Sequence, residues 1–140
     1  MPIALKRAHE KRSLSDGERV LVDRLWPRGV KKSAIGIWLK DLAPSHELRR
    51  WFHARPAQWP LFRKRYLQEL MLPEAARALD ELYELANSHK KVTLLYASRN
   101  QEHNNAVVLK ELLEGMRKPP HSSGPERAGA GAIRARRSAR

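Results

Sequence analysis

The sequence predicts an α/β fold, with a small, mainly parallel sheet flanked by helices and a helical insertion between the two central strands. Two short stretches, residues 20–22 and 92–96, are almost entirely apolar, as expected for strands covered on both faces in a parallel sheet. The long segment between them repeats apolar residues at helical spacing, so the two strands are expected to pair in parallel across helices.

The first part of the chain is predicted to form two strands and a stiff turn. Residues 2–6 are mostly apolar, and a polar segment ending in a Ser-Asp-Gly turn signal precedes the second strand, residues 19–23. The turn after this strand is rigid because Pro27 fixes its own backbone and pushes Trp26 towards extended geometry. Gly29 then permits a bend that a side chain would resist.

The middle of the chain is predicted to be mainly helical. Residues 31–43 mix strand-like alternation with helical spacing, and a short helix leading into an extended stretch over 38–43 is favoured. Ser45 is a good N-cap directly after a proline, and apolar stripes follow it. The helices predicted from these stripes cover residues 46–54, 58–71 and 73–87.

A second buried strand and a last helix complete the predicted domain. The strand covers residues 91–97, and Ser98-Arg99-Asn100 forms the turn beyond it. Asn100 is expected to be the N-cap of the final helix, which runs to residue 114. His103 would then fall in the first turn of this helix, where the helix dipole disfavours the charged imidazole.

Composition divides the chain into a domain and a tail. Residues 1–116 are expected to form the single α/β domain, and residues 117–140 a disordered basic tail rich in Pro, Gly, Ala and Arg. The tail carries seven basic residues and one acidic residue, yet the domain also has a positive excess within the total net charge of +13. Such a charge favours nucleic acid, phosphorylated small molecules or an anionic membrane as partners.

Composition also excludes several classes of protein. The chain has no cysteine, which rules out disulfides, thiolate catalysis and Cys-based zinc sites. Histidine and carboxylate side chains leave a metal site open in principle, but the six histidines include no ligand-like pair at helical spacing. No metal or cofactor is therefore assigned. No apolar run approaches the roughly 20 residues that span a bilayer, and the N-terminus does not resemble a signal peptide. We expect a cytoplasmic protein without membrane contacts; its oligomeric state stays open.

An anion-binding site is predicted at the carboxyl end of the strand 19–23, because ligands of α/β sheets bind beyond the strand ends. Arg24 and Arg28 lie on the stiff turn there, and each planar guanidinium can bind phosphate or carboxylate in bidentate fashion. Asp23 is expected to orient them or to act as a general base, with its pKa lowered by their charge. A structural ion pair of one arginine with Asp23 or Asp41 is the alternative.

The turn after the second buried strand extends this site if the two strands are neighbours. Ser98 and Arg99, with the amides that follow, could hold an anion at a helix N-terminus, although capping alone would also explain them. His103 is the candidate proton carrier, with an exposed or core-packed imidazole as the favoured alternative. Asn104 could bind a base or a sugar. Trp26 is expected to pack under its turn, with stacking on a nucleobase as the weaker alternative.

Several long motifs occur in the order found in a known family. They read Arg19-Val-Leu-Val-Asp-Arg-Leu-Trp-Pro-Arg-Gly29, Trp38-Leu-Lys-Asp-Leu-Ala-Pro-Ser45, Leu48-Arg-Arg-Trp-Phe52, Trp59 with Phe62 and Tyr66, Leu94-Leu-Tyr-Ala97 and Glu102-His-Asn-Asn-Ala106. With these motifs, residues 2–115 resemble the YeaO-like family of small bacterial proteins, the domain of unknown function 488. The resemblance implies a cytoplasmic protein with a small α/β fold and implies no reaction. The matching residues able to do chemistry are Asp23, Arg24, Arg28, Asp41, His103 and Asn104.

Two functions from different classes follow. The favoured one is a small enzyme or ligand-binding domain for an anionic, phosphate-bearing molecule clamped by Arg24 and Arg28. The alternative is a non-catalytic nucleic-acid-binding or regulatory module that uses the basic surface and the tail. A third is a partner-binding protein whose interface is formed by the helices of residues 46–87. The sequence leaves open the substrate, the reaction and whether the protein is an enzyme.

Overall fold

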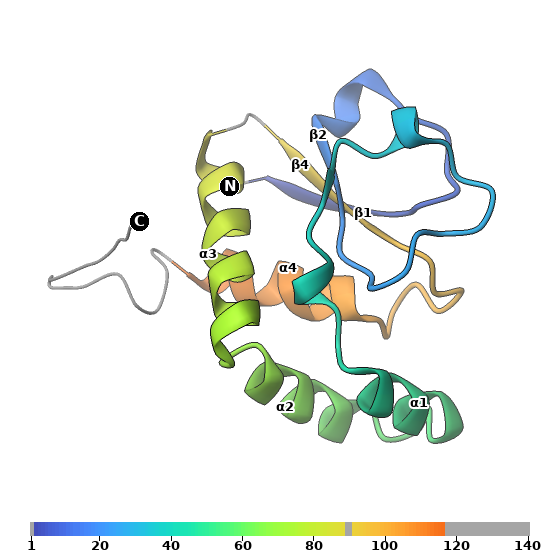
Figure 1. Cartoon of the computed structure of the whole chain (residues 1–140), viewed down its shortest axis with the longest axis vertical. Helices are drawn as coiled ribbons and strands as arrows, with labels where there is room; N and C mark the ends of the chain where they lie inside the picture. Colours follow the sequence, from blue (N-terminus) through green and yellow to red (C-terminus); the bar gives the residue numbers. More distant parts are fainter. Residues whose placement is uncertain (1, 89–90, 117–140) are drawn as a thin grey trace, which may run out of the picture.

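The computed structural model describes residues 2–88 and 91–116, and its strands form one parallel sheet (Figure 1). The strands are β1 (Ile3–Arg7), β2 (Glu18–Leu21), β3 (Ile37–Trp38) and β4 (Val92–Tyr96), in the spatial order β1-β4-β2-β3. The pairings of β4 with β1, β4 with β2 and β2 with β3 are parallel. The parallel α/β sheet is confirmed, and the two apolar strands are direct neighbours within it.

The described residues contain four α-helices, and three of them lie between β3 and β4 in the chain. The helices are α1 (His46–Ala54), α2 (Trp59–Glu69), α3 (Pro73–Ser88) and α4 (Asn105–Gly115). Figure 1 shows α1 and α2 below the sheet and α3 rising beside it, which is the predicted helical insertion between β2 and β4. Within the part of the chain that the structure describes, no helix combines the length and apolarity needed to cross a membrane.

The two faces of the sheet are covered differently. Val20 and Leu94 belong to a large core cluster that also includes residues of all four helices. The opposite face has a smaller cluster around Leu21 and Leu95, which loop residues cover: Ala8, Trp26, Val30 and Ile35. Because strand residues alternate between faces, adjacent residues of β2 and β4 contribute to different clusters. Helices therefore cover one face of the sheet, and loops cover the other.

A buried ion cluster fixes the amino end of β2. The carboxylate of Asp16 accepts hydrogen bonds from Nη1 of Arg19 at 2.6 Å, from Nζ of Lys6 at 3.0 Å and from the Ser13 amide at 2.9 Å. Burial alone would raise the pKa of Asp16, but the Ser13 amide and the two cations outweigh burial and lower this pKa to about 2. Asp16 therefore stays ionised and paired at neutral pH.

The segment between β2 and α1 differs from the prediction. The expected short helix is present as the 3-10 helix η2 (Lys32–Ala34), but the extended stretch over residues 38–43 is wrong. The two-residue β3 ends at Trp38, and the 3-10 helix η3 (Lys40–Leu42) follows. Pairing with β2 ends where the Leu39 amide donates to the Leu21 carbonyl at 2.9 Å. Leu39 and Leu42 then enter the core, which bends the chain away from the sheet. The disordered tail predicted for residues 117–140 lies outside the described residues.

Candidate functional site

Asp23 connects β2, β4 and α4 at the carboxyl edge of the sheet. The Ala97 amide, directly after β4, donates to Oδ2 of Asp23 at 2.8 Å. Nδ2 of Asn105, the first residue of α4, donates to Oδ1 of Asp23 at 3.2 Å and to the Val22 carbonyl at 2.9 Å. The ends of the two central strands therefore lie side by side, which is the arrangement in which parallel sheets form ligand sites.

The pKa of Asp23 is raised by burial, and the Ala97 amide, Asn105 and the charge of Arg49 offset part of this rise. The expectation that Arg24 and Arg28 lower the pKa of Asp23 is therefore wrong. The hydrogen bonds to the Asp23 carboxylate come from neutral amide groups, and a neutral donor stabilises a carboxylate less than a directly bonded cation does. Neither Asp23 nor Asp41 forms a salt bridge with these arginines within the described residues.

A tyrosine extends the Asp23 network into the core. Tyr66 of α2 is fully buried, its hydroxyl donates to the Leu42 carbonyl, and it also bonds Asn105. Burial, followed by the negative charges of Asp23 and Glu69, raises the pKa of Tyr66 well above its usual value, so the phenol stays protonated. Sequence reasoning missed the hydrogen bonds of Tyr66 to the Leu42 carbonyl and to Asn105. The available signal was the phenol inside an apolar helical stripe, because a buried hydroxyl needs a partner.

Arg24 and Arg28 are both exposed, but their hydrogen bonds connect them to segments that follow the two outer strands of the sheet, β3 and β1 respectively. Nη2 of Arg24 donates to the Ala43 carbonyl at 3.3 Å, in the segment after β3 and η3. The Arg28 carbonyl accepts from Nε2 of His9 at 3.0 Å, in the segment after β1. Gly29 has the positive φ of 81° that the turn prediction required. The turn is therefore tied to the segment after β3 through the Arg24 side chain and to the segment after β1 through the Arg28 backbone.

Asn100 organises the turn after β4. Its Oδ1 accepts hydrogen bonds from the amides of Glu102 and His103 at 3.0 and 2.9 Å, and its own amide donates to Oγ of Ser98 at 3.1 Å. Ser98 and Arg99 are exposed at the same edge as Asp23. The amides expected to cradle an anion already have an acceptor in Asn100, so binding at this turn would depend on the two exposed side chains.

The last helix starts later than predicted. Asn104, not Asn100, is the N-cap of α4: its Oδ1 accepts from the Val107 amide at 3.0 Å. His103 consequently lies before the helix, and its expected place in the first helical turn is wrong. Its half-buried ring stacks on Trp59 of α2, with the centroids 4.6 Å apart and the planes at 13°. Asn104 is 4% exposed and acts as a cap.

Trp26 packs under its turn. Its Nε1 donates to the Val30 carbonyl at 2.7 Å, and its ring meets Trp38 edge to face at 5.5 Å. The ring is half-buried against the loop-side cluster of the sheet. Packing was the favoured of the two expectations for Trp26. Asp41 lies exposed in η3.

Arg7 adds a guanidinium that sequence reasoning did not single out. It is the last residue of β1, and its Nη2 donates to the Ala97 carbonyl at 3.1 Å. Its Nε is buried and has no hydrogen-bond partner among the described residues. Buried donors without partners are uncommon, so this N–H marks an unsatisfied polar group at the end of β1. The available signal was its position directly after the first predicted strand, residues 2–6.

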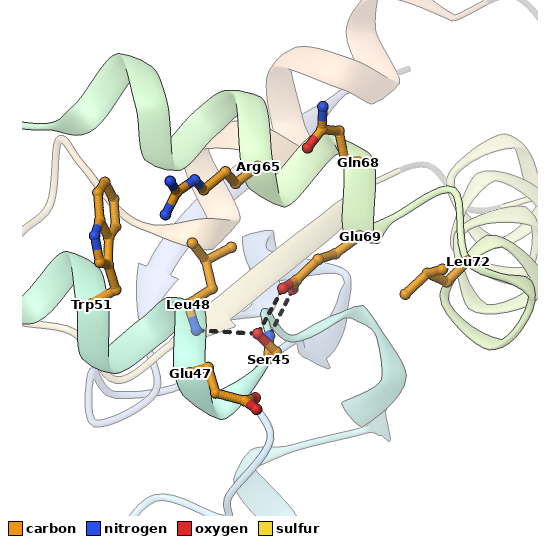
Figure 2. Close-up of a pocket in the computed structure, with 8 residues that line it drawn as sticks. All are labelled: Ser45, Glu47, Leu48, Trp51, Arg65, Gln68, Glu69 and Leu72. Carbon is orange, nitrogen blue, oxygen red and sulfur yellow. Dashed lines mark hydrogen bonds between the residues drawn. The ribbon is translucent and has the colours of Figure 1, made fainter.

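A shallow hollow lies away from this edge, between α1 and α2 (Figure 2). At one end of it, Ser45, the N-cap of α1, is joined to Glu69 of α2. The Ser45 amide and Oγ both donate to the Glu69 carboxylate, at 2.7 and 2.6 Å. At its other end, Arg65 extends from α2 towards the ring of Trp51 on α1. Its lining consists of Ser45, Glu47, Leu48, Trp51, Arg65, Gln68, Glu69 and Leu72. None of the predicted site residues lines it.

The chemistry at the strand edge is electrostatic. It offers the half-buried carboxylate of Asp23 held by amides, exposed guanidiniums from Arg24 and Arg99, and the unsatisfied Nε of Arg7. Within residues 2–88 and 91–116, no group of three or more His, Asp or Glu side chains is arranged to hold a metal ion. This edge can therefore recognise negative charge through forked donors.

Comparison with known proteins gives a consistent result. A family model described as "Inactive DUF488-N3 subclade" matches residues 2–126, which extends past the end at residue 115 expected from the motifs. The chain is 42% identical over 120 residues to the uncharacterized protein YeaO of Escherichia coli, covering 83% of this chain and 100% of that protein. It is also 42% identical over 115 residues to an uncharacterized protein of Mycobacterium tuberculosis, covering 81% and 94%. No solved structure matches.

Proposed function

Because this chain belongs to the DUF488 family and matches its subclade described as inactive, we propose that it is a non-catalytic domain that binds a phosphate-type anion at the carboxyl edge of its sheet. The residues proposed to contact the anion are Arg24, Arg28, Ser98 and Arg99. Guanidiniums recognise phosphate through parallel N–H···O bonds, and a hydroxyl can add a further donor.

One observation carries this proposal: the Ala97 amide donates to Asp23 at 2.8 Å. That bond holds the turn after β4 against the turn after β2, so Arg99 and Arg24 belong to one edge although they are far apart in the chain. Arg7 supports the proposal, since its buried Nε at the neighbouring end of β1 has no partner among the described residues.

Asp23 has a positioning role in this proposal. It links two turns through amide hydrogen bonds and does not contact the anion. It affects anion binding only by holding these turns in place. The proton-transfer roles predicted for Asp23 and His103 are left out of the proposal. Both oxygens of the half-buried Asp23 carboxylate already accept amide hydrogen bonds, and the His103 ring is stacked on Trp59.

Titration calorimetry of the full chain with inorganic phosphate and with pyrophosphate tests the proposal. Replacing Arg24 or Arg99 by Ala should weaken binding by about tenfold each, because a hydrogen bond to a charged group contributes about 1.5–3 kcal/mol. Arg77→Ala is the matched control, since Arg77 is an exposed arginine on α3. Equal affinities for the wild type and for both strand-edge variants would refute the proposed site, as would a loss of the same size in Arg77→Ala.

A further inference from the structure

The exposed side of α1 and α2 is strongly basic. Residues 46–65 contain six Arg and Lys side chains and one acidic side chain, Glu47. Arg63 is engaged with Glu111 of α4, with Nε and Oε1 3.2 Å apart. The remaining cations are all exposed and define what is called the α1–α2 basic surface: Arg49, Arg50, Arg55, Lys64 and Arg65. Most of these residues are arginines, which offer flat, forked donors to phosphate.

Two of these arginines pack on Trp51 of α1, beside the hollow that Glu47 and Glu69 also line. The Arg65 guanidinium carbon is 4.5 Å from the centroid of the Trp51 ring, and that of Arg55 is 5.6 Å from the same ring. Figure 2 shows Arg65 reaching from α2 towards Trp51 on α1. Trp51 therefore supports an exposed, planar cation, and a nucleobase can stack on such a plane.

The two helices are fixed against each other, so the surface is preorganised. Phe52 of α1 stacks on Phe62 of α2 with the centroids 4.5 Å apart, and Trp59 lies 5.8 Å from Phe52. At the opposite end of α1, Ser45 donates twice to Glu69 of α2. A surface that needs little ordering on binding loses less free energy when it captures a ligand.

We infer that the α1–α2 basic surface binds single-stranded nucleic acid. Arg50 and Lys64 supply contacts to phosphates, and the Arg65–Trp51 stack supplies a platform for a base. A single strand fits this combination because its bases are free to stack, whereas a duplex keeps them inside. An anionic membrane fits less well, since interfacial helices insert apolar rings and guanidiniums cover the Trp51 ring. An acidic peptide would match the charge but lacks planar groups for the stack.

The residues varied on this surface are not among those proposed to contact the anion, so either proposal can fail without the other. Arg24 and Arg99 are unchanged in the variants described below. Arg49 is also unchanged, because its charge acts on Asp23. The basic residues of 117–140 are present in every variant, so their contribution to nucleic-acid affinity is common to all samples.

Fluorescence anisotropy of the full chain with a labelled thymidine oligonucleotide of about 12 nucleotides tests the inference. The triple variant Arg50→Gln, Lys64→Gln, Arg65→Gln should bind at least about tenfold more weakly, and the slope of log affinity against log salt should fall by about 2. Arg77→Gln on α3 is a control that removes one exposed arginine away from this surface, and it should change the affinity and the salt slope by no more than the loss of one distant charge does. Circular dichroism confirms folding, since exposed substitutions shift stability by about 0.5 kcal/mol or less.

A second variant isolates stacking from charge. Arg65→Lys keeps the positive charge but removes the plane, so it should lose about fivefold or more in affinity while the salt slope stays unchanged. Equal affinity in Arg65→Lys and wild type would overturn the stacking platform. Unchanged binding by the triple variant, or tighter binding of the same sequence as a duplex, of poly-glutamate or of phosphatidylglycerol vesicles, would overturn single-stranded nucleic acid as the partner.

Discussion

Two aspartates lie on either side of β2, and their surroundings differ. Asp16, before the strand, receives Lys6 and Arg19 as direct partners, and despite burial its pKa is lowered to about 2. Asp23, after the strand, receives amide donors such as that of Ala97, and burial raises its pKa. The same residue type is thus a permanent counter-ion before the strand and a carboxylate with neutral donors after it.

This difference assigns a structural role to the amino end of β2 and a candidate binding role to its carboxyl end. At the amino end, acid and base side chains neutralise one another inside the protein, so little charge is left for a ligand. At the carboxyl end, Arg24 and Arg99 have no acidic partner within the described residues, and Arg7 keeps an unsatisfied N–H. Negative charge is therefore expected to be recognised at the carboxyl end.

Asp16→Ala should have the largest effect on stability. It leaves the Arg19 guanidinium without its counter-ion although Arg19 is only 1% exposed. Removing one partner of a buried ion pair costs about 3–5 kcal/mol. Urea denaturation followed by circular dichroism measures this loss. A cost below about 1 kcal/mol would mean that the cluster is not a structural anchor.

The pH dependence of stability should have opposite signs for the two aspartates. The pKa of Asp16 falls from 3.8 to about 2 on folding, so its contribution of about 2 kcal/mol is present above 3.8 and lost as the pH falls through 2. The pKa of Asp23 is raised on folding, so its contribution is lost as the pH rises from 3.8 through the folded value.

Denaturation of wild type, Asp16→Asn and Asp23→Asn between about pH 6 and about pH 2 checks these signs. The advantage of wild type over Asp16→Asn should shrink as the pH falls. The stability of wild type relative to Asp23→Asn should increase over the same range. Two differences of the same sign would contradict the distinction between the two carboxylates.

Asp23→Ala should cost less than Asp16→Ala. It removes the acceptor of the Ala97 amide and of Asn105, and unsatisfied buried donors cost about 1–3 kcal/mol. Loss of the desolvated carboxylate offsets part of this cost, so we expect a net loss of about 1–2 kcal/mol in the same denaturation experiment. A loss equal to that of Asp16→Ala would show that Asp23 is an equally strong structural anchor.

Arg63→Ala should have the smallest effect and sets the lower limit of the comparison. Its partner is Glu111 at 3.2 Å, and the two side chains are 43% and 52% exposed. Exposed ion pairs contribute about 0–1 kcal/mol, because water screens them and two long side chains must be ordered. The melting temperature of this variant should stay close to that of wild type. A loss as large as that of Asp16→Ala would mean that burial is not what distinguishes the Asp16 cluster.

The sequence predicted those parts of the fold that depend on local patterns. The apolar runs of β2 and β4 indicated buried parallel strands, and the structure confirms their pairing, with Val20 opposite Leu94. Apolar spacing also predicted a helix over residues 46–54, and the observed α1 has the same bounds, His46–Ala54. Adjacent strands in a parallel sheet end at the same edge, so the meeting of Asp23 with the turn after β4 followed from the topology.

The remaining differences have non-local causes. Asn100 and Asn104 are both good N-caps, and the choice of Asn104 places Asn105 where its side chain reaches Asp23. The pKa of Asp23 could not be inferred from its sequence neighbour Arg24, because that guanidinium contacts the Ala43 carbonyl instead. Chain neighbours predict charge interactions poorly where a turn directs the side chains apart.

The most direct test of the carboxyl edge is an amide NMR titration of the full chain with inorganic phosphate at constant ionic strength. We expect saturable shifts concentrated in residues 23–28 and 97–103, while the amides around Asp16 stay in place. Absence of saturable shifts, or shifts of equal size around Asp16, would contradict the assignment of anion binding to this end of β2.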